Sequence, residues 1–187
     1  MADLNTTEEY DGNSWAAGGN LGTAASGLAG CGTQGAGFAA GGTEYKATTE
    51  EYDGSSWSAG GNMSAAKRDF EMVGLQTAAL NFGGQTNGLV TTTETYNGSA
   101  WSNQGNLTGT ARSGSSSFGT STAGAVAGGW TGSIQTLTNE FNGASWTDVS
   151  AALGTGSFSH GACGTQTAAL SRVGGYNDVT IYRTCEE

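Results

Sequence analysis

Proline is absent from the 187 residues, and histidine and cysteine are scarce. The single histidine, His160, makes a Ser/His/Asp triad a matter of chance and is expected to line a wall or channel. The cysteines, Cys31, Cys163 and Cys185, are an odd number and match no metal-ligand spacing. We therefore expect no enzyme activity, no metal and no cofactor, and we expect Cys31 and Cys163 to be small buried residues in crowded strands.

Basic residues are also few, with six Lys and Arg against sixteen Asp and Glu, for a net charge of −10. Nucleic-acid binding depends on clustered Lys and Arg that neutralise phosphates, so no nucleic-acid partner is expected, and anionic membrane surfaces are disfavoured for the same reason. No segment reaches the ~18 consecutive apolar residues of a membrane span, so no membrane insertion is expected. The first five residues lack the basic and apolar regions of a signal peptide, which predicts a soluble protein made in a cytoplasm.

What the chain has in abundance is glycine, with 34 residues, and a motif that occurs four times. The motif reads aromatic, Asp or Asn, Gly, two small residues and Trp. Asp-Gly and Asn-Gly tolerate the positive φ of a tight hairpin, so each copy predicts a hairpin tip. The first aromatic residues are 42, 44 and 45 residues apart, a period typical of solenoids and propellers. The structural repeat residues are Tyr10, Trp15, Tyr52, Trp57, Tyr96, Trp101, Phe141 and Trp146.

A glycine pair marks a second fixed point in every unit, at residues 41–42, 83–84, 128–129 and 174–175. Short runs and turns alternate between the two fixed points, which predicts four antiparallel strands per unit. Four such units cannot each bury an apolar face alone, so we predict a single all-β domain over residues 1–187, a β-propeller of about four blades. The units are expected at approximately 23–60, 65–101, 110–146, and 1–20 together with 155–187.

The chain begins with the third and fourth strands of a unit and later reaches the first and second strands of its last unit. We expect these N-terminal and C-terminal strands to pair and close the ring, because closure removes exposed sheet edges. Residues 179–183 read as an extra third strand, which leaves two arrangements open. Either they form a spare strand at the edge, or they take the third position and move residues 1–9 onto a neighbouring unit.

The glycine pair, a Glu two residues before the Tyr (Glu8, Glu50 and Glu94), and the Trp five residues after it resemble the kelch repeat. The resemblance spans essentially the whole chain and implies a kelch-like propeller. Kelch units commonly carry an Arg after the Trp strand. Arg68 and Arg112 stand there in two units, whereas the other two units have serine, so no complete ring of arginines is expected.

The amino-acid sequence of the repeats, such as Thr-Thr-Glu-Glu-Tyr-Asp-Gly-Ser-Ser-Trp at residues 48–57, also resembles kelch-like repeats in structural proteins of bacteriophages, especially marine phages and cyanophages. That resemblance implies a component of the virion. The implied function is a non-enzymatic structural or decoration protein of the capsid or tail, acting through contacts with other virion proteins. The resemblance does not choose between capsid and tail, and it leaves homo-oligomer formation open.

The segments between each glycine pair and the next Tyr or Phe vary in length, and variable loops on a rigid scaffold often carry recognition. They hold Tyr45, Trp130, Tyr176 and Asn177, of which Trp130 is the one tryptophan outside the repeated motif. Exposed aromatic rings stack on sugars or anchor protein partners. These four residues are the candidate binding site, and the alternative function is a lectin-like propeller that recognises a host surface receptor or glycan. The competing interpretation is that the rings only cover the corners of the blades.

Overall fold

The structure is a computed structural model that describes residues 3–173, 176–177, 180–181 and 184–186. All regular secondary structure in this part of the chain is β-strand. The described residues contain no helix that could cross a membrane. The predicted all-β fold is confirmed.

Three four-stranded antiparallel sheets form the middle of the molecule, each with its strands in sequence order. The first contains β3 (Ala29–Thr33), β4 (Ala36–Ala40), β5 (Thr49–Tyr52) and β6 (Trp57–Ala59). The second contains β7 (Glu71–Leu75), β8 (Ala78–Phe82), β9 (Thr93–Tyr96) and β10 (Trp101–Asn103). The third contains β11 (Ser116–Gly119), β12 (Gly124–Ala127), β13 (Thr138–Phe141) and β14 (Trp146–Val149). The predicted pattern of four strands is confirmed in these three sheets.

The two ends of the chain form smaller sheets. β1 (Glu8–Tyr10) and β2 (Trp15–Ala17) pair with each other. β15 (Ala162–Thr165) pairs with β16 (Ala168–Val173), and β19 (Thr184–Glu186) adds to the other edge of β16. Between β16 and β19, β17 (Tyr176–Asn177) and β18 (Thr180–Ile181) form a short pair of their own.

The repeated motif forms the turn between the third and fourth strands of a unit. In the second copy, the Asp53 carboxylate accepts hydrogen bonds from the backbone N–H groups of Ser55 and Ser56 at 2.9 and 2.8 Å. Gly54 has a φ of +90°, which favours glycine at this point of the turn. The hydrogen bonds favour the ionised carboxylate and lower the pKa of Asp53 to about 2. The predicted hairpin tips are confirmed, because the same backbone bonds recur at Asp11, Asn97 and Asn142.

The apolar core lies between adjacent sheets. One cluster fills the space between the first and second sheets, and a second cluster fills the space between the second and third. Leu80, Phe82 and Phe141 are completely buried in the second cluster, and full burial of such a side chain contributes about 1.5–3 kcal/mol. The glycine pairs allow the sheets to approach: a Cβ atom at Gly41 would lie only 2.4 Å from the ring of Phe70.

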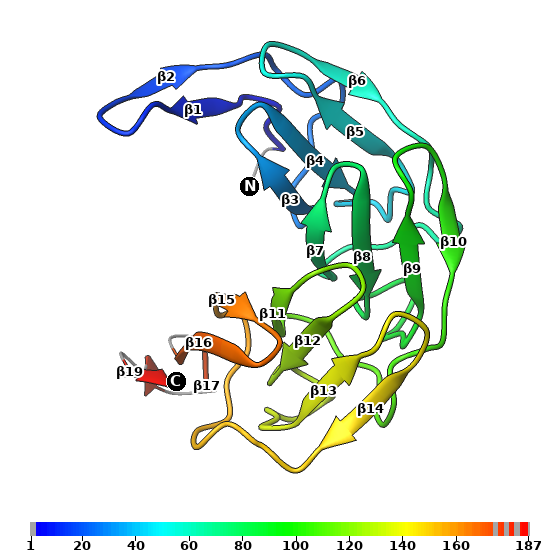
Figure 1. The fold of residues 1–187 in the computed structure, drawn as a ribbon, viewed down its shortest axis with the longest axis vertical. Helices are drawn as coiled ribbons and strands as arrows, with labels where there is room; N and C mark the ends of the chain where they lie inside the picture. Colours follow the sequence, from blue (N-terminus) through cyan, green and yellow to red (C-terminus); the bar gives the residue numbers. More distant parts are fainter. Residues whose placement is uncertain (1–2, 174–175, 178–179, 182–183, 187) are drawn as a thin grey trace.

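The sheets fan around a common centre in an open arc, with β3, β7, β11 and β15 on the inside (Figure 1). The β1–β2 pair lies at one end of the arc, and the sheet of β15, β16 and β19 lies at the other. The predicted pairing of N-terminal with C-terminal strands is wrong for the described strands, since β1 pairs with β2 and β19 occupies the place beside β16. The arrangement is therefore propeller-like, but the described strands do not close a ring.

The strand that extends the last sheet comes from residues 184–186 and not from residues 179–183, as the sequence had suggested. Thr180 and Ile181 pair instead with β17, and residues 179, 182 and 183 lie outside the described part. The C-terminal chain thus takes the third position of the last unit. Residues 8–10 stay beside β2 and do not join that sheet.

The two repeated cysteines differ in environment. Cys31 packs against the first core cluster, and burial raises the pKa of its thiol to about 12. Cys163 is exposed, so the prediction that it is buried was wrong. The reason is that β15 is the last inner strand of the described arc, and the described residues place no further sheet against it.

Candidate functional site

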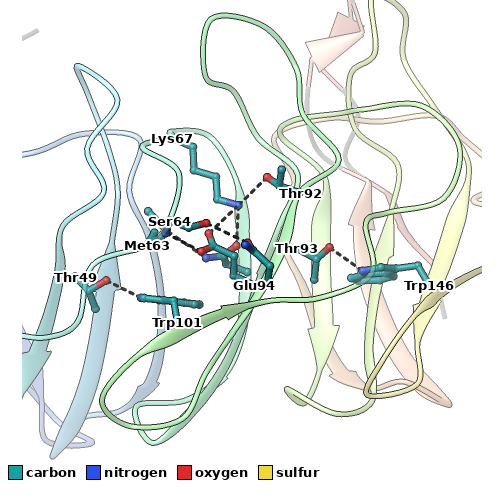
Figure 2. Close-up of polar contacts among 11 residues, drawn as sticks. Thr49, Met63, Ser64, Lys67, Thr92, Thr93, Glu94, Trp101 and Trp146 are labelled. Atoms are coloured by element: carbon teal, nitrogen blue, oxygen red, sulfur yellow. Dashed lines mark hydrogen bonds and ion pairs between the residues drawn. The ribbon is translucent and has the colours of Figure 1, made fainter.

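Neighbouring sheets are joined by hydrogen bonds from tryptophan to threonine. Each tryptophan belongs to the repeated motif, and its indole N–H donates to a threonine that lies three residues before the repeated aromatic residue of the preceding unit. Figure 2 shows two of these bonds. The three bonds run from Trp57 to Thr7 (3.0 Å), from Trp101 to Thr49 (3.0 Å) and from Trp146 to Thr93 (2.9 Å).

Tyrosine hydroxyl groups make a second set of contacts between sheets. One interface is an exception: Phe141 has no hydroxyl, and Thr95 stands in the preceding unit at the position directly before the repeated aromatic residue, where other units have a glutamate. Donor and acceptor are therefore absent together at this one interface, so no glutamate there loses a hydroxyl partner. At the other two interfaces the hydroxyl donates to a glutamate of the preceding unit, from Tyr52 to Glu9 and from Tyr96 to Glu51.

The first copy of the motif is exposed where the later copies are covered. Tyr10 is 47% exposed and Trp15 is 67% exposed, whereas Tyr96 is 3% and Trp146 is 4% exposed. The rings of Tyr10 and Trp15 lie 5.1 Å apart, as close as the equivalent rings in the other units. The turn is thus the same, and the difference is that no preceding sheet lies beside β1 and β2 in the described structure.

A buried lysine joins the loop before β7 to the strands β8 and β9. Lys67 is completely buried, and its Nζ donates to Asn81 at 2.7 Å and to Thr92 at 3.4 Å, with Glu94 at 4.0 Å (Figure 2). Burial lowers the pKa of Lys67 to about 8, although the charge of Glu94 opposes this change. Glu94 also accepts the backbone N–H of Ser64 at 2.8 Å. The network joins a loop and two strands of one unit around a buried ammonium group.

A cavity of about 460 Å³ lies where the inner strands begin and where the segments after the glycine pairs start. Its position matches the end of the molecule that carries the variable loops. Aromatic and polar side chains face it together, which is typical of binding sites for small organic ligands. The side chains that line it include Asp69, Phe70, Glu71, Gln85, Trp130 and Phe158.

Trp130 is the predicted site residue that lines this cavity. It is half-buried, and its ring lies 5.7 Å from the ring of Phe158. Its backbone is fixed to Ser113 by two hydrogen bonds of 2.9 and 3.2 Å. Trp130 also lines a second cavity of about 430 Å³, together with Ile134 and Gly156. The ring therefore stands between two cavities on a well-held backbone.

The other three predicted site residues are not brought together with Trp130. Tyr45 is half-buried under the guanidinium group of Arg68, which lies 5.1 Å from the ring centre. Arg68 in turn lies 3.6 Å from the carboxylate of Asp69 at the edge of the cavity. Tyr176 and Asn177 form β17, and their side chains lie outside the described part of the structure.

Glu71 lines this cavity, and the pKa of its carboxyl group is raised. Burial raises the pKa of Glu71 to about 8, the negative charge of Asp69 adds to the rise, and Arg112 opposes it. Near neutral pH the group is therefore mostly protonated and can both donate and accept a hydrogen bond. Such a group suits a neutral ligand with hydroxyl groups better than an anion.

The sequence did not single out Asp69 and Glu71 as site residues, although a signal existed. Asp69 and Ser159 adopt φ values of +52° and +55°, at the position where Gly27 and Gly114 stand in the other units. A left-handed conformation at a non-glycine residue costs about 1–3 kcal/mol and is concentrated at functional sites. The charged stretch 67–72, which replaces small residues of other units, was the visible departure from the repeat.

Among the described residues, no group of three or more His, Cys, Asp and Glu side chains is arranged to hold a metal ion. His160 is buried, and its Cε1 would lie 2.9 Å from a Cβ atom placed on Gly128, so it forms part of the packing around that glycine pair.

No protein-family model matches the chain, and no curated protein matches it.

Proposed function

We propose that this protein is a non-enzymatic structural protein of a phage virion, which decorates the capsid or tail through protein-protein contacts. The resemblance of its repeats to those of phage structural proteins supports the virion location. The fold supports a contact role, because repeated side-chain bonds join its sheets into one body. Partners are other virion proteins.

The observation that carries this proposal is the exposure of Tyr10 and Trp15 at one end of the arc. Tyrosine and tryptophan are enriched at protein interfaces and often dominate their binding energy. The covered copies of the motif, such as Tyr96 with Trp101, show that the same pair packs well when a sheet lies beside it. The exposed pair therefore has the same ring arrangement as a pair that packs against a sheet, which supports a contact role for it.

The virion proposal is tested by probing purified particles of the phage that encodes this chain with an antibody against it. We expect the protein in intact particles at a constant copy number relative to the major capsid protein. Immunogold labelling then assigns it to the capsid or the tail. A protein that remains in the soluble lysate and is missing from purified particles would refute the proposal.

The cavity around Trp130 favours a second candidate function, recognition of a host surface glycan. Trp130 and Phe158 offer rings for stacking on a sugar face, and the protonated carboxyl group of Glu71 and the amide of Gln85 offer hydrogen bonds. None of the described residues that line the cavity is basic, which fits a neutral sugar. The two functions are compatible in a protein that attaches the virion to its host.

A glycan array separates the two candidates. Wild-type protein that binds a neutral glycan, and a Trp130→Ala variant that does not, would support recognition in the cavity. Leu75→Ser is the matched control, because it removes an exposed apolar side chain that does not line the cavity and should keep the signal. Wild-type protein that binds no glycan would remove the second candidate and leave the first intact.

A further inference from the structure

The bonds between sheets give each unit a donor side and an acceptor side. Tryptophan and tyrosine reach back to the preceding unit, and threonine and glutamate receive them. In the described structure, one set of donors at the N-terminal end and one set of acceptors at the C-terminal end do not take part in such bonds. Tyr10 and Trp15 are the donors at the N-terminal end, and Thr138 and Glu140 of β13 are the acceptors at the other end. Within the described residues, no hydrogen bond to the side chains of Thr138 and Glu140 is formed.

A cavity of about 240 Å³ lies beside the unused acceptors. Thr138, Glu140, Gln166 and Ala168 contribute to its wall, together with Ala127 of β12. The equivalent space of the preceding interface holds Trp146, whose ring lies 4.7 Å from Phe82 and whose N–H bonds to Thr93. The cavity is therefore the place that a tryptophan of a following unit would fill.

The unused donors and acceptors also match in kind. Tyrosine faces glutamate at two interfaces, and phenylalanine replaces it where Thr95 replaces the glutamate. Tyr10 retains its hydroxyl, and Glu140 stands at the glutamate position, directly before the repeated aromatic residue Phe141. The N-terminal end of the chain thus carries the donor that the C-terminal acceptor requires.

β19 occupies the position beside β16, and its sequence and register resemble those of a third strand such as β1. Thr184 is opposite Val173, the register in which Thr93 is opposite Phe82 in the second sheet. Residues 184–186 read Thr-Cys-Glu, and residues 7–9 read Thr-Glu-Glu. β19 supplies only the third strand, because no fourth strand is paired with it in the described structure. The β1–β2 pair offers both the third and the fourth strand.

We propose that the β1–β2 pair of one copy docks at the C-terminal end of a second copy, where β1 replaces β19 beside β16. The Trp15 indole then donates to Thr138 and the Tyr10 hydroxyl to Glu140. The partner is a second copy because the two ends of one chain lie apart in the arc (Figure 1). Hydrogen bonds between neighbouring sheets hold the sheets that lie between the two ends. Closely packed interfaces do not deform continuously, so the arc does not bend to bring its own ends together. The contact joins different surfaces, so it adds copies head to tail. This inference uses the same exposed pair as the virion proposal, but it does not depend on a location in the virion.

Sedimentation velocity over protein concentrations from about 1 μM to about 1 mM tests the docking. We expect wild-type protein to form dimers and larger species as the concentration rises. Trp15→Ala should weaken this association at least about tenfold, as for a central aromatic residue of an interface. Leu75→Ser is the matched control, because Leu75 is an exposed apolar residue of a middle sheet and should not affect association. Wild-type protein that stays monomeric throughout would overturn the proposal, and so would equal effects of the two variants.

A mixing experiment distinguishes docking between copies from ring closure within one chain. Trp15→Ala removes the donor end, and Ala168→Trp fills the acceptor cavity with a side chain of its own. Both residues are exposed, so both variants should fold, and unchanged urea midpoints would verify this. Each variant alone should associate much more weakly than the wild type, because the intact end finds no intact partner in a copy with the same defect. Equimolar mixtures should form a one-to-one complex through the intact ends, and mixtures that stay monomeric would overturn the proposal.

Discussion

The indole N–H of Trp146 donates to the hydroxyl of Thr93 at 2.9 Å in a buried position, whereas Thr138, its counterpart in the next unit, accepts no side-chain hydrogen bond among the described residues. Thr93→Val should therefore lower the free energy of unfolding by about 1–3 kcal/mol, because a buried donor loses its acceptor. Thr138→Val is the matched control and should change it by less than about 0.5 kcal/mol. Urea unfolding of dilute protein measures both, and equal losses would contradict the assigned role of the bond.

The buried pair of Lys67 and Glu94 leads to a second prediction. Glu94→Leu leaves the Lys67 ammonium group in the interior without its countercharge, and such a change typically costs about 3–5 kcal/mol. The double variant Lys67→Met/Glu94→Leu should recover most of this loss, because no charge then remains buried. Unfolding free energies of the two single variants and the double variant give the coupling. Additive losses would show that the two side chains act independently.

Glu71 makes stability depend on pH. Its pKa is raised from 4.5 to about 8 in the folded protein, so the folded state binds more protons than the unfolded state between these values. The stability contributed by the protonated group is present below about pH 4.5 and is lost as pH rises towards 8, with a slope of at most about 1.4 kcal/mol per pH unit. Glu71→Gln should remove this slope. Thermal unfolding from pH 4.5 to 8 checks it, with Asp53→Asn as a control because the lowered pKa of Asp53 lies below that window.

Removal of residues 184–187 tests whether β19 competes with β1 for the place beside β16. The truncated chain should associate more tightly than the wild type, since the docking strand no longer has to displace a strand of the same chain. Sedimentation velocity measures the change, and the urea midpoint of the three middle sheets serves as the folding control. Weaker association of a truncated chain with an unchanged midpoint would instead show that β19 belongs to the docking surface.

The strands and their turns could be predicted from the sequence because their causes are local. An Asp or Asn beside Gly54 or its counterparts determines the hairpin within four residues, and the glycine pairs mark where backbones approach. The end of the ring could not be predicted in the same way. Residues 7–9 and residues 179–183 both read as third strands in the sequence, whereas the packing places residues 184–186 beside β16.

The candidate site depends on contacts between residues that are far apart in the chain. Trp130 could be identified because it is the one tryptophan outside the repeat, but its neighbour Phe158 and the cavity residue Glu71 lie in other units. Their meeting follows from the arc, which brings the starts of several inner strands to one place. The departure of residues 67–72 from the small residues of other units marked the region without indicating its partners.

The replacement of both the tyrosine and the glutamate at the interface of Phe141 with Thr95 has an evolutionary consequence. A duplicated unit fits wherever its tyrosine meets a glutamate, so the gene can lengthen or shorten by whole repeats while each junction stays satisfied. The unit that begins at residue 110 is not freely interchangeable, because its phenylalanine would leave the glutamate of any other neighbour without a hydroxyl donor. Recombination among such genes should therefore keep this unit and the one before it together as an inherited pair.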